Sequence, residues 1–223
     1  MKITTIITAG GVGKRMGATI PKQFLELDKT PVLMHTIQAF YAVFPAGELL
    51  VTLPKDWWSF WEELCVKHGF MIKHQLVEGG KERFHSIQNA LQHATGEIVL
   101  IHDGVRPLVS KGTMHRVVEE SQKTGAAVPV MPMKESVRFG SLSESKSVDR
   151  NLYFSVQTPQ GFQTPLIKEA YALPYDPKFT DDASVIEKAG FSVVGVEGNE
   201  ENLKITSPFD LKVAQLLINK SMG

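Results

Sequence analysis

Three glycines within four positions, close to the N-terminus, are followed directly by a lysine and an arginine. Glycine lets backbone N–H groups approach an anion closely, and cationic side chains beside those amides add full positive charge. Residues 1–25 contain four basic side chains and no acidic one. We therefore expect this segment to bind phosphate groups. Its glycines and cations are Gly10, Gly11, Gly13, Lys14, Arg15 and Lys22.

Two better-known glycine loops do not fit this segment. The dinucleotide-binding fingerprint requires a glycine or alanine where Met16 stands. The P-loop requires a glycine where the chain has Thr8, and a hydroxyl residue where it has Arg15. The phosphate site must therefore belong to another kind of nucleotide-binding protein.

Asp103 is a second group with possible chemistry, because it directly follows the apolar run 98–102. A carboxylate at the end of a strand can hold Mg²⁺, which prefers oxygen ligands and keeps several waters. The nearby Arg106 offers an alternative, in which it pairs with Asp103 and both residues serve the structure. The sequence leaves both interpretations open.

Short runs rich in Val, Ile and Leu alternate with longer amphipathic runs along the chain. This alternation predicts an α/β fold with a mostly parallel sheet and helices on both faces. Ligands of such sheets bind beyond the carboxyl ends of the strands, which is where the glycine segment and Asp103 would lie. We expect strands at Ile3–Thr8, Leu49–Leu53, Met71–Val77, Ile98–His102, Ala127–Val130 and Val193–Val196.

The helices are predicted from apolar residues at helical spacing and from their start signals. We expect the first helix to begin at Pro31 with Thr30 as its capping residue. Further helices are predicted near Trp57–His68, Glu82–Ala94 and Lys111–Lys123, and a last one from Ser207-Pro208. Gly, Ser, Lys and Asp interrupt the pattern over Glu135–Thr158, which predicts an extended β-arm.

The composition is that of an ordinary globular protein of 223 residues, with 24 basic and 24 acidic side chains. Zero net charge argues against electrostatic binding to nucleic acid. No apolar run approaches the length of a membrane span, and the N-terminus lacks the pattern of a signal peptide. The single cysteine, Cys65, suits a reducing compartment, so we expect a cytoplasmic location.

The segment from Ala9 to Phe24 resembles the G-x-G-x-R-M-x(n)-P-K signature of nucleotidyltransferases. More narrowly, the chain is similar to the cytidylyltransferases that act on 2-C-methyl-D-erythritol 4-phosphate, the IspD family. Six further blocks follow in the order of that family and make the resemblance specific. They are Gly79-Gly80-x-x-Arg83-x-x-Ser86, His102-Asp103-Gly104-Val105-Arg106-Pro107, Asp149-Arg150-Asn151, Gln157-Thr158-Pro159-Gln160-Gly161-Phe162, Thr180-Asp181-Asp182-Ala183-Ser184 and Glu197-Gly198-x-x-x-Asn202-x-Lys204-Ile205-Thr206.

The resemblance implies a Rossmann-like fold of the nucleotide-diphospho-sugar transferase type, formed by residues 1–223 as one domain. It implies Mg²⁺-dependent transfer of CMP from CTP to the polyol phosphate in the non-mevalonate isoprenoid pathway, with pyrophosphate released. It also implies a homodimer in which residues 135–158 pack against the second subunit. No general base is required, because the attacking phosphate oxygen is already ionised at neutral pH, so positioning and charge stabilisation do most of the work.

The same resemblance assigns roles to individual residues. Arg15 and Lys22 would stabilise the transition state, and Asp103 would bind Mg²⁺. Arg150, Lys204 and Thr180 would position the acceptor, with Arg150 serving the site of the partner. The CTP-binding residues would be Ala9, Gly10, Gly11, Gly13, Gly80 and Ser86.

Two departures and three alternatives accompany this interpretation. Lys81 stands where many members of the family carry an acidic residue, and Gly104 stands where alanine is frequent. The closest alternative is a ribitol 5-phosphate cytidylyltransferase, although the blocks at Arg150 and Thr180 look more like the methylerythritol enzymes. A nucleotidyltransferase for sugar 1-phosphates is opposed by the late blocks. A non-catalytic nucleotide-binding regulator would have no need of the cations Lys22, Arg150 and Lys204 together.

Overall fold

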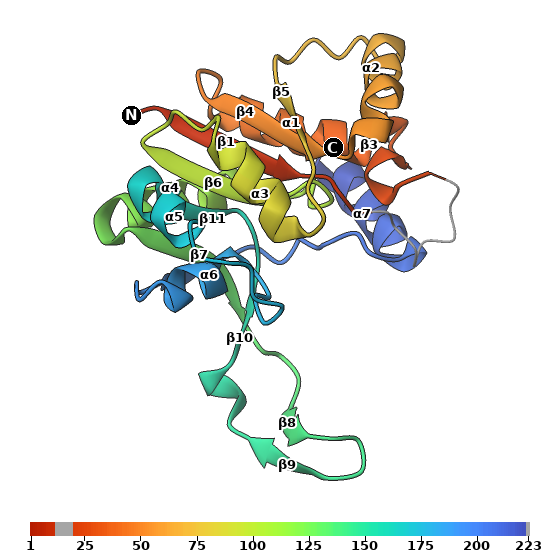
Figure 1. The fold of residues 1–223 in the computed structure, drawn as a ribbon. Coiled ribbons are helices and arrows are strands. Elements are labelled where there is room, and N and C mark those ends of the chain that lie inside the picture. Colours follow the sequence, from red (N-terminus) through yellow and green to blue (C-terminus); the bar gives the residue numbers. More distant parts are fainter. Residues whose placement is uncertain (12–19, 222–223) are drawn as a thin grey trace.

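A computed structural model describes residues 1–11 and 20–221 of the chain. Its main sheet has eight strands, in the order β10-β7-β11-β6-β1-β4-β5, with β12 also paired to β7 (Figure 1). These strands are β1 (Ile3–Thr8), β4 (Glu48–Leu53), β5 (Gln75–Glu78), β6 (Ile98–Asp103), β7 (Ala126–Pro132), β10 (Phe154–Val156), β11 (Gln160–Gln163) and β12 (Val194–Glu197).

Seven α-helices and two small hairpins complete the described part of the chain. The helices are α1 (Val32–Val43), α2 (Trp58–Lys67), α3 (Arg83–Leu91), α4 (Lys111–Thr124), α5 (Thr164–Ala170), α6 (Asp182–Lys188) and α7 (Pro208–Ser221). Three short 3-10 helices are η2 (Lys22–Phe24), η3 (Lys55–Trp57) and η4 (Arg150–Leu152). The hairpins are β2 (Glu26–Leu27) with β3 (Thr30–Pro31), and β8 (Val137–Gly140) with β9 (Ser145–Val148).

The sheet is mostly parallel with helices on both faces, as predicted. Strand β1 pairs in parallel with β4 and β6, and β5 and β12 continue this pattern. Consecutive residues of β1 point to opposite faces: Ile7 packs with residues of α1, α2 and α4, and Ile6 packs with residues of α3, α5 and α6. Both isoleucines are fully buried, which explains why the strand lacks polar alternation.

Three features of the fold were not predicted from the sequence. Strand β11 runs antiparallel to β6 and β7, and the short helices α5 and α6 follow it. The predicted strand at Met71–Val77 forms only from Gln75 onward. The prediction that Thr30 caps the first helix was wrong, because Thr30 lies in β3 and the helix begins after Pro31 without a side-chain cap.

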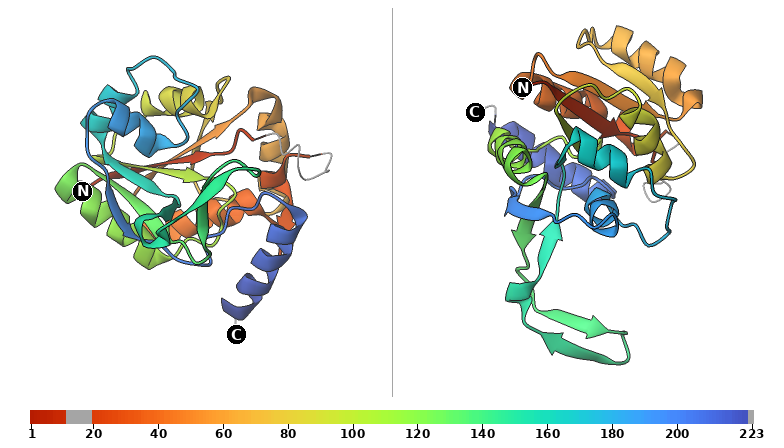
Figure 2. Two further views of the ribbon diagram at one scale, coloured as in Figure 1. Left: turned by 90° about the horizontal axis from the view of Figure 1, so that it is seen from below. Right: turned by 60° about the vertical axis from the view of Figure 1, so that its left-hand side comes forward.

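The β-arm predicted over 135–158 is present but shorter. Strands β8 and β9 and η4 project from one end of the sheet, as the views in Figures 1 and 2 show. Strand β10 returns to the sheet and pairs with β7, and Gln157 and Thr158 are buried in the body of the fold. Large apolar side chains are exposed along the arm and at the start of β10, namely Phe139, Leu142, Leu152 and Phe154. Within the residues that the structure describes, no helix has the length and apolar character needed to cross a membrane.

The parallel pairing fixes where a site can form. Thr8 is level with Thr52 and Asp103 in the register, so the carboxyl ends of β1, β4 and β6 meet at one edge. Leu53 is level with Glu78, which adds the end of β5 to the same edge. The loops that follow these four strands therefore converge.

Candidate active site

An open cleft of about 330 Å³ lies at the carboxyl ends of these strands. It brings together the first loop, the loop between β5 and α3, the end of β6 and the segment before α7. Its lining residues are Thr8, Ala9, Gly10, Gly11, Lys22, Gln23, Thr52, Pro54, Gly79, Gly80, Lys81, Glu82, Arg83, Ser86, Asp103, Val105 and Lys204. Eight of the residues assigned to the site from the sequence are among them.

Backbone and side-chain hydrogen bonds hold the described part of the first loop. The Ala9 N–H donates to the Thr52 carbonyl at 2.9 Å, and the buried Gln23 amide donates to the Ala9 carbonyl at 2.6 Å. A Cβ atom on Gly11 would lie 3.8 Å from Cε of Lys22, so the lysine stem runs close beside the glycine backbone. This arrangement sets a cation next to backbone N–H groups, as phosphate binding requires.

Three of the predicted phosphate-binding and catalytic residues, Gly13, Lys14 and Arg15, lie outside the described residues. The roles implied for them by the family resemblance stay predictions. Lys22, the other predicted catalytic residue, lies at the start of η2 and lines the cleft.

Gly80 and Ser86 form a wall of the cleft next to the first loop, where a Cβ atom on Gly10 would lie 4.0 Å from Oγ of Ser86. The Gly80 N–H donates to the Ser86 hydroxyl at 2.9 Å, and this hydroxyl lies 3.2 Å from the Glu82 carbonyl. A Cβ atom on Gly80 would lie 2.3 Å from Cβ of His85, so no other residue fits without a shift of the backbone. Ser86 is buried in the wall and is therefore not an ordinary serine on the helix surface.

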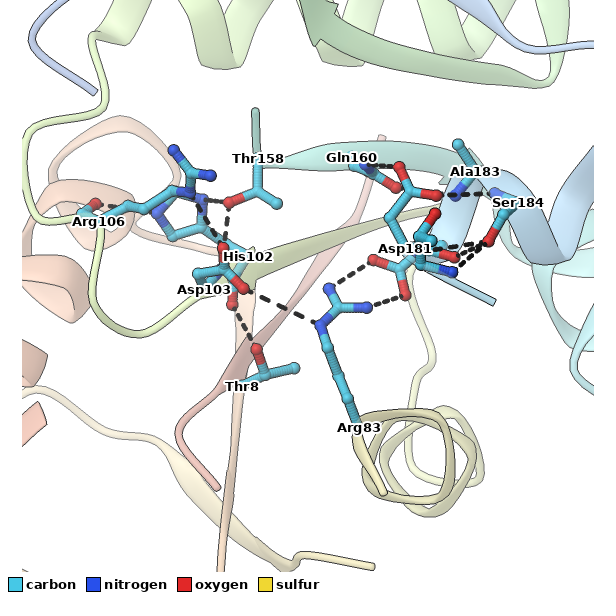
Figure 3. A network of polar contacts seen from close by, with 12 residues as sticks. Thr8, Arg83, His102, Asp103, Arg106, Thr158, Gln160, Asp181, Ala183 and Ser184 are labelled. Atoms are coloured by element: carbon cyan, nitrogen blue, oxygen red, sulfur yellow. Dashed lines mark hydrogen bonds and ion pairs between the residues drawn. The ribbon is translucent and has the colours of Figure 1, made fainter. Parts of the chain in front are cut away.

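Asp103 lies at the centre of a cluster of cations. Its Oδ2 is 3.0 Å from Nε of Arg106 and 3.1 Å from Nζ of Lys204. Its Oδ1 is 3.9 Å from Nε of Arg83 (Figure 3). Burial alone would raise the pKa of this carboxyl, but the three cations outweigh that effect and hold its pKa below the usual range. Asp103 is thus ionised at neutral pH.

Arg106 has the structural role that the sequence left open. Besides Asp103, its guanidinium binds the Asn202 carbonyl at 2.8 Å. It thereby ties the turn after β6 to the segment that carries Lys204, which is also held by the hydrogen bond from the Ile205 N–H to the Val105 carbonyl. Lys204 remains nearly half exposed at the edge of the cleft.

Arg150 and Thr180 do not line the main cleft. Arg150 lies in η4 on the arm, where its guanidinium donates to the carbonyl of Lys134. The neighbouring Asp149 accepts from the Asn151 N–H at 3.0 Å. Thr180 lines a smaller neighbouring pocket, of about 110 Å³, which shares Glu82 and Arg83 with the main cleft.

The sequence interpretation gave no role to Arg83 or to Asp182, although both lie in the recognised blocks. Both terminal nitrogens of Arg83 donate to the carboxylate of Asp182 at 2.7 Å. The signal was present in the sequence, since each residue follows a loop at the predicted ligand edge. Nothing in the sequence alone shows that two residues 99 positions apart form one pair.

Cations outnumber acids along the described lining of the cleft. The cations are Lys22, Lys81, Arg83 and Lys204, and the acids are Glu82 and Asp103. A concave surface with excess positive charge attracts small anions and stabilises negative charge that moves during a reaction. A protein with no net charge therefore offers a local site for phosphorylated ligands.

Comparison with known proteins supports this assignment. The family model for IspD, 2-C-methyl-D-erythritol 4-phosphate cytidylyltransferase, matches residues 3–220. The enzyme of that name from Bacteroides fragilis is 49% identical over 216 residues, which cover 96% of this chain and 99% of the relative. The one from Phocaeicola vulgatus is 47% identical over 214 residues, with 96% and 98% covered.

Solved structures of enzymes with the corresponding names have a similar fold. The 2-C-methyl-D-erythritol 4-phosphate cytidylyltransferase of Thermus thermophilus is 33% identical, with a TM-score of 0.78 over 98% of this chain and 100% of that chain. The 4-diphosphocytidyl-2C-methyl-D-erythritol synthase of Anaerococcus prevotii is 27% identical, with a TM-score of 0.83 over 97% and 96%. The match spans the glycine loop, the cation cluster and the arm alike, and the chain belongs to the IspD family of cytidylyltransferases.

Proposed function

We propose that the protein transfers CMP from CTP to 2-C-methyl-D-erythritol 4-phosphate, which gives 4-diphosphocytidyl-2-C-methyl-D-erythritol and pyrophosphate. The observation that carries this proposal is the position of Lys22 and Lys204 in one cleft, with the glycine loop beside Lys22 and the Gly80–Ser86 wall lining the same cleft. Two phosphorylated reactants repel each other, and cations from separate parts of the chain offset that repulsion. The family membership supplies the identity of the nucleotide and of the acceptor.

The proposed step is an in-line displacement at the α-phosphorus of CTP. A phosphate oxygen of the acceptor forms a bond to this phosphorus, and the bond from the phosphorus to the oxygen shared with the β-phosphate breaks. The electron pair leaves with pyrophosphate, and no proton has to be removed from the nucleophile. Lys22 would stabilise the charge on the phosphates in the transition state, with Arg15 assisting as the family implies.

The base and the acceptor would bind at opposite ends of the cleft. Ala9, Gly10, Gly80 and Ser86 form a narrow wall in which the buried serine hydroxyl and backbone groups can meet the edge of a base. Lys204 would bind the acceptor phosphate at the other end. Thr180 would bind from the adjoining small pocket if the acceptor extends past Arg83.

Mg²⁺ is the proposed cofactor, and the residues present fit it. The described residues hold no cluster of three His, Cys, Asp or Glu side chains that could bind a metal alone. They do offer Asp103, an ionised carboxylate in the cleft. Mg²⁺ at nucleotide sites commonly takes one or two carboxylates together with substrate phosphates and waters. When bound, it would neutralise charge on the triphosphate.

A second copy of the chain is the proposed partner. Exposed Phe139, Leu142 and Leu152 give the arm apolar surface that a monomer rarely leaves in water. In a symmetric dimer the arm of one subunit would bring Arg150 to the cleft of the other. This position would explain why Arg150 lies away from the cleft of its own subunit. We place the enzyme in the cytoplasm, where the single thiol stays reduced.

The experiment that tests the reaction supplies purified protein with Mg²⁺ and CTP, and either 2-C-methyl-D-erythritol 4-phosphate or ribitol 5-phosphate. Pyrophosphate release is expected only with an acceptor present, and faster with the methylerythritol compound. Equal or faster turnover of the ribitol compound would overturn the acceptor assignment. Turnover of neither would support a nucleotide-binding regulator.

A further inference from the structure

Arg83 and Asp182 form a pair that the reaction proposed above does not use. Arg83 is the first residue of α3, and Asp182 is the first residue of α6. Nη1 and Nη2 of Arg83 each lie 2.7 Å from one oxygen of the Asp182 carboxylate, a bidentate contact. The Tyr171 hydroxyl donates to Oδ1 of the same carboxylate at 2.6 Å.

A buried ion pair of this kind contributes little net stability to a fold. Asp182 has no exposed surface, whereas a third of the Arg83 side chain is exposed to the cleft. Removing a carboxylate from water is unfavourable, and well-packed apolar residues often replace such pairs without loss of stability. Stability alone therefore does not explain the buried carboxylate of Asp182. Its effect on the position of the Arg83 guanidinium is the property to consider.

The position of Arg83 relative to Asp103 offers that explanation. Arg106 and Lys204 both approach Oδ2 of Asp103 at hydrogen-bonding distance, 3.0 and 3.1 Å. Oδ1 faces Arg83 Nε at 3.9 Å, which is too long for a hydrogen bond. The guanidinium is thus close enough to attract Oδ1 and yet is held back from it by its two bonds to Asp182.

We propose that Asp182 is a positioning residue that withholds Arg83 from Asp103, so that Oδ1 of Asp103 stays available to the Mg²⁺ ion of the reaction. This inference rests on the proposed function, in which Asp103 supplies one oxygen to that ion. A guanidinium bonded to both oxygens of a carboxylate competes with a metal for the same lone pairs. Asp182 removes this competition by occupying the fork, and Tyr171 keeps Asp182 in place.

The alternative is that the pair is only a structural salt bridge, a strut that joins α3 to α6. The two roles predict different results when the charge on Asp182 is removed. If the pair is a strut, Asp182→Asn lowers the stability of the fold, and any change in the Mg²⁺ requirement follows from a general loosening of the site. If Asp182 withholds Arg83, the arginine instead moves toward the nearest remaining carboxylate, which is Asp103. It then competes with Mg²⁺, and the requirement for Mg²⁺ rises.

The test begins with the crystal structure of Asp182→Asn. We expect Arg83 to close on Asp103, with at least one guanidinium nitrogen within about 3.2 Å of Oδ1, the ordinary limit of such a bond. An Arg83 that remains bonded to residue 182 and stays near 3.9 Å from Asp103 would overturn the inference. This structural measurement does not depend on activity.

The kinetic measurement is the free Mg²⁺ concentration that gives half the maximal rate of CMP transfer at saturating CTP and acceptor. For Asp182→Asn we expect it to rise about tenfold, the change that corresponds to one strong competing interaction. In the double variant Arg83→Gln/Asp182→Asn it should return to within about threefold of the original value, because the competitor is gone. A double variant that is no better than Asp182→Asn would support the strut.

Three further variants keep the test decisive. Ile186→Val, also in α6 and fully buried, is the control for loosening and should leave the Mg²⁺ requirement unchanged. If Asp182→Asn does not fold, Arg83→Gln alone separates the roles: withholding predicts an equal or lower Mg²⁺ requirement, and a strut predicts a higher one.

Asp103→Asn distinguishes this inference from the proposal that Asp103 binds Mg²⁺. If it leaves the requirement unchanged, the metal assignment itself fails; if it raises the requirement and Asp182→Asn does not, only the inference fails.

Discussion

The ring of His102 and the hydroxyl of Thr158 lie 2.9 Å apart in the buried layer directly beneath Asp103. The other ring nitrogen, Nε2, lies 3.0 Å from the Arg106 carbonyl, which can only accept a hydrogen bond. The network therefore assigns the proton to Nε2 and makes Nδ1 the acceptor from Thr158. The Thr158 hydroxyl in turn accepts from the Asp103 N–H at 3.2 Å, so a neutral histidine supports the turn that carries Asp103.

We predict that His102 makes the protein less stable in mildly acidic solution. Burial lowers the pKa of His102 to about 4, against an ordinary value near 6.5. The unfolded chain then binds a proton that the folded chain excludes, so stability is complete above about pH 6.5 and is lost as the pH falls toward 4. Between pH 7.5 and pH 4.5 this loss amounts to about 2–3 kcal/mol.

Urea unfolding of the original chain and of His102→Asn at these two pH values checks the prediction. The variant is less stable at pH 7.5, but its free energy of unfolding should fall by about 2–3 kcal/mol less on acidification. The pKa of His74 is also lowered by burial, but His74 is present in both proteins and cancels. Asp103, with its lowered pKa, acts only below about pH 4. Equal losses in the two proteins would show that His102 is not the group responsible.

Lys22→Ala is expected to reduce kcat far more than it weakens CTP binding. The ammonium group lines the cleft and would act mainly on charge that develops in the transition state. Removing one such electrostatic contact typically lowers kcat about 10²- to 10³-fold. Lys55→Ala, an exposed lysine in η3, is the matched control and should leave both constants unchanged. A Lys22→Ala enzyme with normal kcat would remove this residue from the mechanism.

The sequence was sufficient to predict the layered fold and most of the cleft, because both depend on local pattern. The apolar runs of β1, β4 and β6 are readable as buried strands, and parallel strands bring their carboxyl ends to one edge. Gly80 and Asp103 each follow such a strand, so their convergence could be expected.

The features that escaped prediction depend on long-range contacts. Strand β11 has four residues and takes its place from antiparallel pairing with β6, which no local pattern reveals. Arg83 finds Asp182 across 99 residues, and Thr30 loses its capping role because it pairs with Leu27 in a hairpin. In each case tertiary pairing determines the outcome, and propensity decides little.

The Gly80–Ser86 wall should determine the affinity for CTP. Ser86→Ala removes the acceptor of the Gly80 N–H and is expected to weaken CTP binding about fivefold, the value of one ordinary hydrogen bond. Gly80→Ala should weaken it more, because the new Cβ would overlap His85 and push the loop away. Calorimetric titration with CTP in the absence of acceptor measures both changes.

The control for this pair of variants is Gly69→Ala, in the loop between α2 and β5, where a Cβ meets no neighbouring atom within 4 Å. Gly69 has a positive φ of 57°, so the substitution strains the backbone without touching the cleft. CTP affinity should be unchanged in that variant. Equal losses in Gly69→Ala and Gly80→Ala would indicate general destabilisation and contradict a local role of the wall.

The last prediction concerns Arg150 and the shared site. If Arg150 serves the partner subunit, a dimer that joins one Lys22→Ala chain to one Arg150→Ala chain contains one intact site and one doubly defective site. Random exchange of equal amounts makes half of the dimers mixed, so the mixture should recover about a quarter of the original activity, whereas each variant alone is nearly inactive. The mixture is assayed after subunit exchange has been verified with differently tagged chains. Activity that remains at the mean of the two variants, in chains shown to exchange, would mean that each subunit completes its own site and that Arg150 acts, if at all, through the arm to which the Lys134 carbonyl ties it.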